Sequence, residues 1–309
     1  MVRLFLYFIH DSFSFPLTDS GAFLYLCTMQ TAILYIQSEL QGLYPETEIR
    51  NFSYLIIEKL TGFTRTEIYI NKNTLFSNEQ QHVIESFIEK LKKNVPIQYI
   101  LGETEFYGLP FYVNESVLIP RPETEELVDW IQKENNKNAE LKILDIGTGS
   151  GCIAIALKHE MSNSLVDAFD ISEKALETAK KNAALNKSAV NFAVVDILNA
   201  HDFSKKWDII VSNPPYIAEN EKTGMLPNVL DHEPHLALFV PDNDPLLFYR
   251  KIAHFAKQHL HPNGKLYFEI NRENGKLCMD LLTGLGFHDV ELRKDISGND
   301  RMVRGVLVN

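Results

Sequence analysis

The chain has 309 residues, 45% of them hydrophobic and 23% charged, a balance typical of a globular protein with one large domain and a small one. Its formal net charge of −11 argues against a broad surface for nucleic-acid phosphates. Three widely spaced cysteines give no disulfide framework, which predicts a cytoplasmic protein.

Residues 1–28 differ from the rest of the chain. They are rich in Phe, Leu and Tyr, but His10, Asp11 and Pro16 interrupt the apolar runs. The run 4–9 is too short to span a membrane and makes a poor signal peptide. We expect a poorly structured extension, produced by a start codon assigned too early, and no membrane association. The alternative is a genuine targeting or docking segment.

Residues 29–94 carry the periodicity of helices. Apolar side chains recur at three- and four-residue spacing in the segments 33–43, 49–60 and 83–91. This pattern predicts a small helical bundle. Periodicity alone supports only a structural role for this bundle, as a cap.

The remaining chain predicts a linker followed by an α/β domain. From residue 99 to 118, aromatic and β-branched residues with glycine breaks predict a β-hairpin, within a linker that we place at 95–118. From 119 to 309, predicted helices and strands alternate. Such alternation is typical of a mostly parallel sheet with helices on both faces.

A buried strand, a glycine-rich turn and the start of a helix follow one another in residues 142–157. Glycines let the backbone turn sharply and approach a ligand, and the helix N-terminus favours negative charge. The Gly-x-Gly-x-Gly spacing differs from the Gly-x-Gly-x-x-Gly pattern of dinucleotide sites. The residues of this turn that we assign to cofactor binding are Asp145, Gly147, Thr148, Gly149, Ser150 and Gly151.

Two further predicted strands lead into acidic residues. The strand 165–169 is followed by Asp170, which is placed to bind the two hydroxyls of a ribose. The strand 191–195 is followed by Asp196 and Ile197, near where an adenine would lie. We therefore assign all three residues to a nucleoside cofactor. The alternative is an α/β sheet with a tight turn and no nucleotide.

The most specific motif is Asn213-Pro214-Pro215-Tyr216, directly after the apolar strand 207–211. The prolines favour extended backbone and leave carbonyl oxygens free, so the Asn213 amide oxygen and the Pro214 carbonyl can accept hydrogen bonds from a planar amino group. Tyr216 adds a ring that can pack against the bound group. We assign Asn213, Pro214 and Tyr216 to catalysis and all four residues to substrate binding, and we also assign Asn213 to cofactor binding. A proline-rich turn without chemistry is the alternative.

The remaining groups of polar residues do not predict a metal site or a hydrolase. The pairs His232-x-x-His235 and His259-x-His261 lack the companion ligands of a zinc site, so no metal is expected. The sequence has no Gly-x-Ser-x-Gly turn to support a serine hydrolase.

Taken together, these motifs resemble those of the class I S-adenosylmethionine-dependent methyltransferases, in the branch that methylates amide or exocyclic amine nitrogens. In that family the turn 145–151 would hold the methionine end of the cofactor, Asp170 the ribose, and Asp196 would lie near the adenine. The resemblance implies a Rossmann-like, mostly parallel sheet. It also implies that the runs 289–294 and 302–308 form a terminal antiparallel hairpin.

Two further segments narrow the resemblance. Residues 96–128, which include Ile119-Pro120-Arg121-Pro122, look like the release factor glutamine methyltransferases, and so do residues 233–238 and 248–250. The similarity extends from about residue 29 to the C-terminus. The sequence departs from the family at 241–245, where a glycine-containing loop is usual. We expect a surface variation there.

The resemblance implies a function and partners. The chain would methylate the side-chain amide nitrogen of the glutamine in the Gly-Gly-Gln motif of peptide chain release factors. S-adenosylmethionine would be the methyl donor and S-adenosylhomocysteine the product. The helical region 29–94 would recognise the protein substrate, and we expect a monomer that does not bind duplex DNA. The alternatives are an adenine-specific DNA methyltransferase and a non-catalytic cofactor-binding scaffold.

Overall fold

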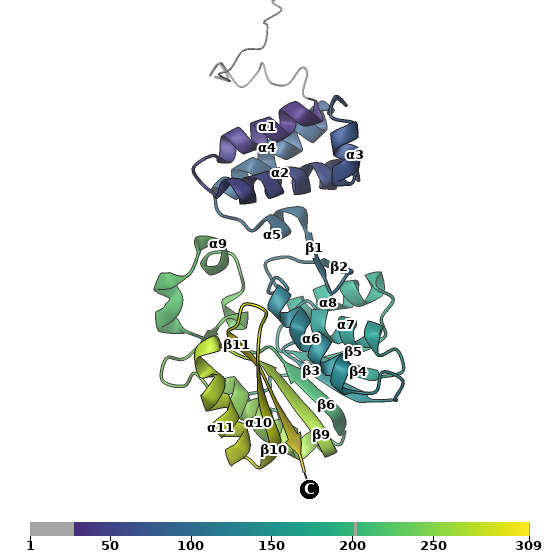
Figure 1. The fold of residues 1–309 in the computed structure, drawn as a ribbon, viewed down its shortest axis with the longest axis vertical. Helices are drawn as coiled ribbons and strands as arrows, with labels where there is room; N and C mark the ends of the chain where they lie inside the picture. The colour runs from purple at the N-terminus through teal and green to yellow at the C-terminus, as the bar shows by residue number, and fades with distance from the viewer. Residues whose placement is uncertain (1–27, 201–202, 309) are drawn as a thin grey trace, which may run out of the picture. The chain divides into compact units, whose positions relative to one another are not determined.

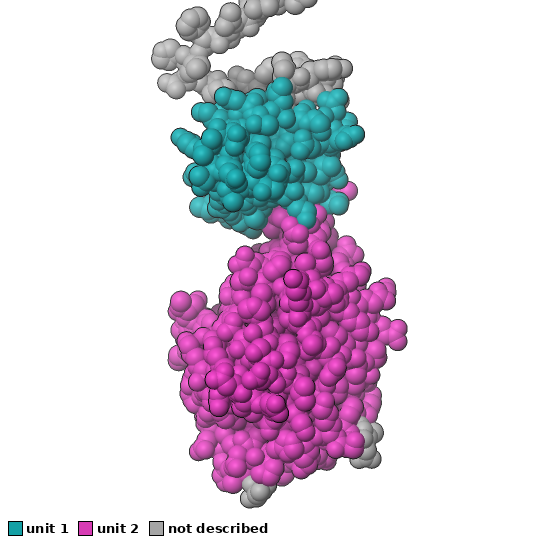
Figure 2. Space-filling model, turned by 90° about the vertical axis from the view of Figure 1, so that its right-hand side faces the viewer, with its two compact units in different colours: residues 1–92 teal, residues 93–309 magenta. Residues whose placement is uncertain are grey.

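The computed structural model describes residues 28–200 and 203–308 (Figure 1). The chain divides into two compact units, residues 1–92 and residues 93–309, which Figure 2 shows in different colours. The extension predicted for residues 1–28 lies outside the described residues, apart from its last position. Within the described part of the chain, we find no helix with the length and apolar character needed to cross a membrane.

The described part of the first unit is helical, as the periodicity predicts. Its elements are α1 (Met29–Leu40), α2 (Glu46–Thr61), α3 (Arg65–Ile70) and α4 (Asn78–Lys92). The Thr28 hydroxyl accepts a hydrogen bond from the Thr31 amide and caps α1. Ile36, Ile56 and Ile88 are buried, one on each of the three longer helices. These apolar stripes form the core of the unit.

The second unit begins with a short helix and a hairpin. These are α5 (Ile97–Leu101), β1 (Glu103–Phe106) and β2 (Leu109–Tyr112). The predicted linker 95–118 contains the expected hairpin and, ahead of it, the short helix α5. Gly102 ends α5 at a φ of +76°, a conformation that glycine adopts without strain, so the hairpin starts only at β1.

The centre of this unit is a seven-stranded sheet in the order β10-β11-β9-β6-β3-β4-β5. Its strands are β3 (Lys142–Ile146), β4 (Leu165–Asp170), β5 (Val190–Val194), β6 (Trp207–Ser212), β9 (Leu260–Glu269), β10 (Phe287–Lys294) and β11 (Asp300–Leu307). All neighbours are parallel except the pairs β10–β11 and β11–β9. The mostly parallel sheet and the terminal antiparallel hairpin are both confirmed.

Helices cover both faces of the sheet (Figure 1). One face packs against α6 (Pro122–Glu134), α7 (Cys152–Glu160) and α8 (Glu173–Leu185), and the other against α10 (Leu247–His259) and α11 (Gly275–Gly284). The connections hold shorter elements: β7 (Ile217–Ala218), η2 (Glu219–Gly224), α9 (Pro227–Leu230), η3 (His235–Ala237), β8 (Phe239–Val240) and η4 (Arg272–Asn274).

Asn182 on α8 fastens the hairpin to the glycine-rich turn. Its amide oxygen accepts a hydrogen bond from the Tyr112 amide at 2.7 Å. Its amide nitrogen donates to the carbonyls of Tyr112 and Ser150 at 3.0 and 2.9 Å. The side chain is fully buried, so these backbone groups have no access to water as a replacement.

We expect Asn182→Ala to lower the free energy of unfolding by about 2–3 kcal/mol, because it leaves buried backbone groups unpaired. Chemical denaturation measures this loss. Lys181→Ala is the control, since Lys181 lies beside Asn182 on α8 and is exposed. A loss of the same size in both variants would contradict the fastening role of Asn182.

Candidate functional site

The predicted site residues follow four neighbouring parallel strands. In the sheet these strands lie in the order β6-β3-β4-β5, and parallel strands end at the same edge. The chain passes from β3 outward to β4 and β5, then returns to the other side of β3 with β6. Ligands of open α/β sheets bind outside the carboxyl ends of the strands at such a reversal. The topology therefore brings the separate motifs to one place.

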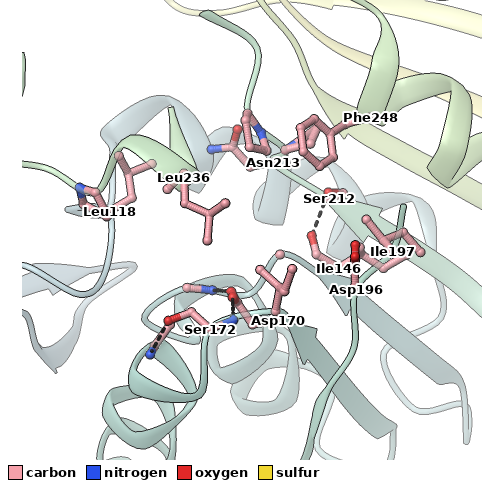
Figure 3. Close-up of a pocket in the computed structure, with 18 of the residues that line it drawn as sticks. Leu118, Ile146, Asp170, Ser172, Asp196, Ile197, Ser212, Asn213, Leu236 and Phe248 are labelled. Atoms are coloured by element: carbon pink, nitrogen blue, oxygen red, sulfur yellow. Dashed lines mark hydrogen bonds between the residues drawn. The ribbon is translucent and has the colours of Figure 1, made fainter. Parts of the chain in front are cut away.

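A cavity of about 200 Å³ lies at this edge (Figure 3). Figure 3 shows Asp170, Asp196 and Asn213 around the same space, with Leu236 and Phe248 also at its walls. The predicted site residues that line the cavity are Gly147, Gly149, Asp170, Asp196, Ile197, Asn213, Pro214 and Pro215. The predicted site residues that do not line it are Asp145, Thr148, Ser150, Gly151 and Tyr216.

Three glycines of the turn have positive φ but serve different purposes. At Gly147 and Gly149, with φ of +74° and +55°, an added Cβ would meet no atom within 4 Å. Both residues line the cavity, so their bare backbone faces the ligand space. At Gly151, a Cβ would approach the Ile155 and Ala179 side chains to 3.0 and 3.2 Å. Gly151 is therefore needed for helix packing.

Asp170 both lines the cavity and holds the turn. Its Oδ2 accepts a hydrogen bond from the Gly149 amide at 2.8 Å, and its Oδ1 accepts one from the Ser172 amide at 2.9 Å. Burial raises the pKa of this carboxyl, and the backbone amides oppose that shift. Each carboxylate oxygen can accept a further hydrogen bond from a ligand hydroxyl.

Asp145 braces the turn from inside the protein. It is fully buried, and its Oδ2 accepts a hydrogen bond from the Thr148 hydroxyl at 2.6 Å. Its Oδ1 has no hydrogen-bond partner among the described residues. Burial raises the pKa of Asp145 to about 7, against the lowering effect of Thr148, and the negative charge of Asp170 adds to the rise.

Asp196 and Ile197 form the wall beyond β5. The two carboxylate oxygens of Asp196 accept hydrogen bonds from the Leu198 amide at 2.9 Å and from the Asn199 side chain at 2.7 Å. Ile197 packs against the apolar cluster under α10 and α11 and also reaches the cavity. An acid beside an apolar surface suits a flat ring with an exocyclic amino group.

In the Asn213-Pro214-Pro215-Tyr216 motif, the first three residues line the cavity and Tyr216 packs against the core. The Asn213 amide nitrogen donates to the Thr124 hydroxyl at 3.4 Å. Neither the Asn213 amide oxygen nor the Pro214 carbonyl accepts a hydrogen bond from any residue that the structure describes. The Tyr216 hydroxyl donates to Glu269 at 3.4 Å, and its ring packs against the apolar cluster of α10 and α11.

An ion pair between partly exposed Arg121 and buried Glu233 joins the two segments that enclose the cavity from the side. Glu233 accepts hydrogen bonds from the Arg121 guanidinium at 2.6 Å and from the Ile119 amide at 3.3 Å. The segments next to these residues, 116–118 and 234–237, contribute cavity walls. This contact explains why the two family-like segments of the sequence, although more than a hundred residues apart, belong to one site.

Sequence reasoning missed most of the apolar walls. The cavity residues that it did not assign include Ile146, Ile171, Val195, Leu236 and Phe248. Ile146, Ile171 and Val195 are neighbours in sequence of assigned residues, so position at a strand end was an available signal. Leu236 and Phe248 lie in the family-like segments 233–238 and 248–250, where the resemblance predicts the family but no role for a single residue.

Two family models match the chain. The model described as "Methyltransferase small domain" matches residues 123–233, and the model described as "PrmC N-terminal domain" matches residues 31–102. The chain is 52% identical to the release factor glutamine methyltransferase of Flavobacterium psychrophilum over 86% of this chain and 94% of the relative. It is 48% identical to that of Bacteroides thetaiotaomicron over 89% and 99% of the two chains.

The chain belongs to the release factor glutamine methyltransferases. A solved protein-(glutamine-N5) methyltransferase from Alicyclobacillus acidocaldarius aligns with 64% of this chain and all of its own, at 25% identity and a TM-score of 0.41. Members of this family are S-adenosylmethionine-dependent enzymes, so this cofactor is the one to test against the cavity. Among the described residues there is no group of three or more metal-ligating side chains that could hold a metal.

The cavity of this methyltransferase fits a nucleoside linked to an amino acid. Its backbone cradle at Gly147 and Gly149 has open space where side chains would stand. Asp170 offers acceptors for ribose hydroxyls, while Asp196 and Ile197 offer an acid and an apolar wall for adenine. These are the residues that we expect to hold S-adenosylmethionine. Asp145, Thr148, Ser150 and Gly151 shape the turn from behind.

We expect Gly149→Val to abolish binding of S-adenosylmethionine, because a side chain would enter the cavity and strain a φ of +55°. Asp170→Ala should weaken binding by about tenfold, by removing one set of hydroxyl acceptors and one support of the turn. Isothermal titration calorimetry measures both effects. Gly224→Ala, at a glycine with ordinary φ and open surroundings, is the control. Wild-type affinity in both site variants would reject this cofactor site.

Asp145 gives the enzyme a pH-dependent stability. Because burial raises its folded-state pKa to about 7 from a usual 3.8, the folded protein holds a proton between these values that the unfolded chain releases. The contribution of Asp145 to the free energy of unfolding therefore falls as the pH rises from about 4 to about 7. Asp145→Asn, measured by denaturation across this range, should remove the decline. Parallel profiles for the two proteins would contradict the assignment.

Proposed function

We propose that this enzyme transfers a methyl group from S-adenosylmethionine to the side-chain amide nitrogen of the glutamine in the Gly-Gly-Gln motif of peptide chain release factors. The family membership supports the reaction class and the substrate protein. The residues that we assign to the reaction are Asn213 and Pro214, with Pro215 at the wall of the cavity.

One observation carries the assignment of the substrate end. Two acceptors, the Asn213 amide oxygen and the Pro214 carbonyl, stand at the cavity without partners among the described residues. A primary amide offers two N–H donors in one plane, which can satisfy both acceptors together. The motif therefore suits a primary amide or an exocyclic amine.

The chain's own residues supply orientation and charge stabilisation. S-adenosylmethionine, when bound, would provide a methyl group on a sulfonium, from which a neutral thioether can leave with the electrons of the broken carbon–sulfur bond. A glutamine amide nitrogen is a poor nucleophile because its lone pair is delocalised. Hydrogen bonds to Asn213 and Pro214 fix the direction of that nitrogen and stabilise positive charge that develops on it. The amide proton can leave after methyl transfer, so the mechanism needs no dedicated base.

The position of Tyr216, away from the cavity walls, favours a supporting role over the predicted contact with the substrate amide. Its hydroxyl bonds to buried Glu269, and burial raises the pKa of the phenol. We propose that Tyr216 anchors the end of the motif to the core and leaves only Asn213, Pro214 and Pro215 at the cavity. The ring then holds the backbone of the preceding prolines.

The protein substrate is favoured over duplex DNA. A base in a duplex must leave the stack, which costs a few kcal/mol, and DNA enzymes offset this with phosphate contacts. A chain of net charge −11 has little capacity for such contacts. A glycine-flanked glutamine is thin enough to enter the cavity. We propose that the enzyme acts as a monomer and that its helical unit, described over residues 28–92, contributes to recognition of the release factor.

We expect Asn213→Ala to reduce methyl transfer by about two to three orders of magnitude while cofactor affinity stays near that of the wild type. Single-turnover assays at saturating S-adenosylmethionine separate these two quantities. Asn163→Ala, on an exposed turn, is the control. An unchanged rate for Asn213→Ala would remove this residue from the mechanism.

The substrate assignment is tested with labelled cofactor and a purified release factor, followed by mass mapping of the modified residue. We expect one methyl group on the glutamine of Gly-Gly-Gln and none on duplex DNA offered in parallel. A short free peptide should be a poor substrate. Methylation of duplex DNA without methylation of the release factor would favour the adenine-specific alternative.

A further inference from the structure

A buried series of hydrogen bonds lies behind Asn213. The Asn213 amide nitrogen donates to the Thr124 hydroxyl at 3.4 Å, and that hydroxyl donates to Glu269 Oε2 at 2.6 Å. Thr124 is 2% exposed and Glu269 is 1% exposed. Neither residue lines the cavity, and the reaction described above uses neither of them.

The sheet register places these groups together. Ser212 at the end of β6 pairs with Phe268 on β9, so the next residues, Asn213 and Glu269, lie at neighbouring strand ends. Thr124 comes from the first turn of α6, which covers the same edge. Residues that are 89 and 145 positions apart in sequence therefore meet in one line of hydrogen bonds.

The number of available protons determines which group donates in each of these hydrogen bonds. A threonine hydroxyl has one proton to donate. If the carboxylate of Glu269 takes that proton in a hydrogen bond, Thr124 can offer only a lone pair to Asn213. Asn213 must then turn its NH₂ group toward Thr124, and its amide oxygen must face the other way.

We propose that Thr124 and Glu269 are positioning residues that hold the Asn213 amide oxygen toward the substrate glutamine. The proposal rests on the proposed function, because it assigns the reason why Asn213 acts as an acceptor. Thr124 and Glu269 do not touch the reacting atoms. They act by excluding the reversed amide, which would present NH₂ donors to the donors of the substrate.

The surroundings of Glu269 determine whether it is a carboxylate that accepts the Thr124 proton. Five charged or titratable groups face Glu269, each from a different element. They are Arg301 on β11, Glu123 on α6, Tyr216 after β6, Tyr249 on α10 and Cys152 on α7. Burial raises the pKa of Glu269 to about 7, while the Thr124 hydrogen bond and the Arg301 charge oppose the rise. A protonated Glu269 could donate to Thr124 and so permit the reversed amide.

The first test removes the Thr124 hydroxyl without changing its shape. We expect Thr124→Val to lower the single-turnover rate about tenfold, with less than about a twofold change in cofactor affinity and in KM for the release factor. Thr124→Ser, which keeps the hydroxyl, should recover most of the rate. Thr178→Val, at a buried threonine on α8 outside this network, is the control for loss of packing. Equal losses in Thr124→Ser and Thr124→Val would overturn the proposal.

The second test asks whether Thr124 acts through Asn213. In a double-mutant cycle, Thr124→Val should lower the rate about tenfold in the wild type but less than about twofold in Asn213→Ala. A merely structural role would give the same fold-change in both backgrounds. Additive effects would therefore overturn the proposal.

The third test uses pH. We expect the single-turnover rate of the wild type to fall as the pH is lowered through the titration of Glu269, because protonation permits the reversed amide. Glu269→Gln carries an oxygen that can still accept from Thr124 and no titrating proton, so its profile should lack this decline. The same decline in both proteins would overturn the part assigned to Glu269. Binding of S-adenosylmethionine, measured at each pH, shows that the site is intact.

These outcomes separate the proposal from the function on which it rests. If the wild type fails to methylate a release factor, the proposed function fails. If the wild type is active and Thr124→Val keeps the full rate, the function stands and the positioning role is wrong.

Discussion

Parallel pairing at the centre of the sheet is the constraint on which the site depends. β6 lies between β3 and β9, and backbone hydrogen bonds hold all three in register. The residues after these strands therefore reach one edge, although they come from distant parts of the sequence. A slip of one residue in β6 would turn its side chains to the opposite face and remove Asn213 from its neighbours. The chemistry depends on this register before it depends on any single side chain.

The two halves of the site achieve rigidity by different means. The cofactor half is a backbone turn that Asp145 braces from within the core and Asp170 from the cavity side. Burial makes the charged form of Asp145 unfavourable and raises its pKa. In return, Asp145 holds the Thr148 hydroxyl and Asp170 holds the Gly149 amide, two groups that a flexible glycine turn would otherwise leave free. The substrate half relies on prolines, which have few conformations and cannot donate their own backbone hydrogen bonds.

Rigidity at the substrate half matters because the reaction needs orientation more than acid–base chemistry. Acceptors that are fixed before the substrate arrives stabilise developing charge without reorganising. Thr124 and Glu269 extend this principle one layer back, since they decide which end of the Asn213 amide faces the cavity. Glu233 and Arg121 serve a related purpose at the wall, where they hold two distant segments together.

The sequence by itself determined the local features: the helical and strand periodicities, the glycine turn, and the motifs at the ends of the strands. These follow from backbone preferences of residues that are adjacent in the chain. Tertiary structure alone decided which motif residues face the cavity. Thr148 and Tyr216 turn inward to buried acids, whereas Leu236 and Phe248 turn toward the ligand space. It also decided the partner of Asn213, because Thr124 lies 89 residues away and meets it only when α6 packs over β6 and β9.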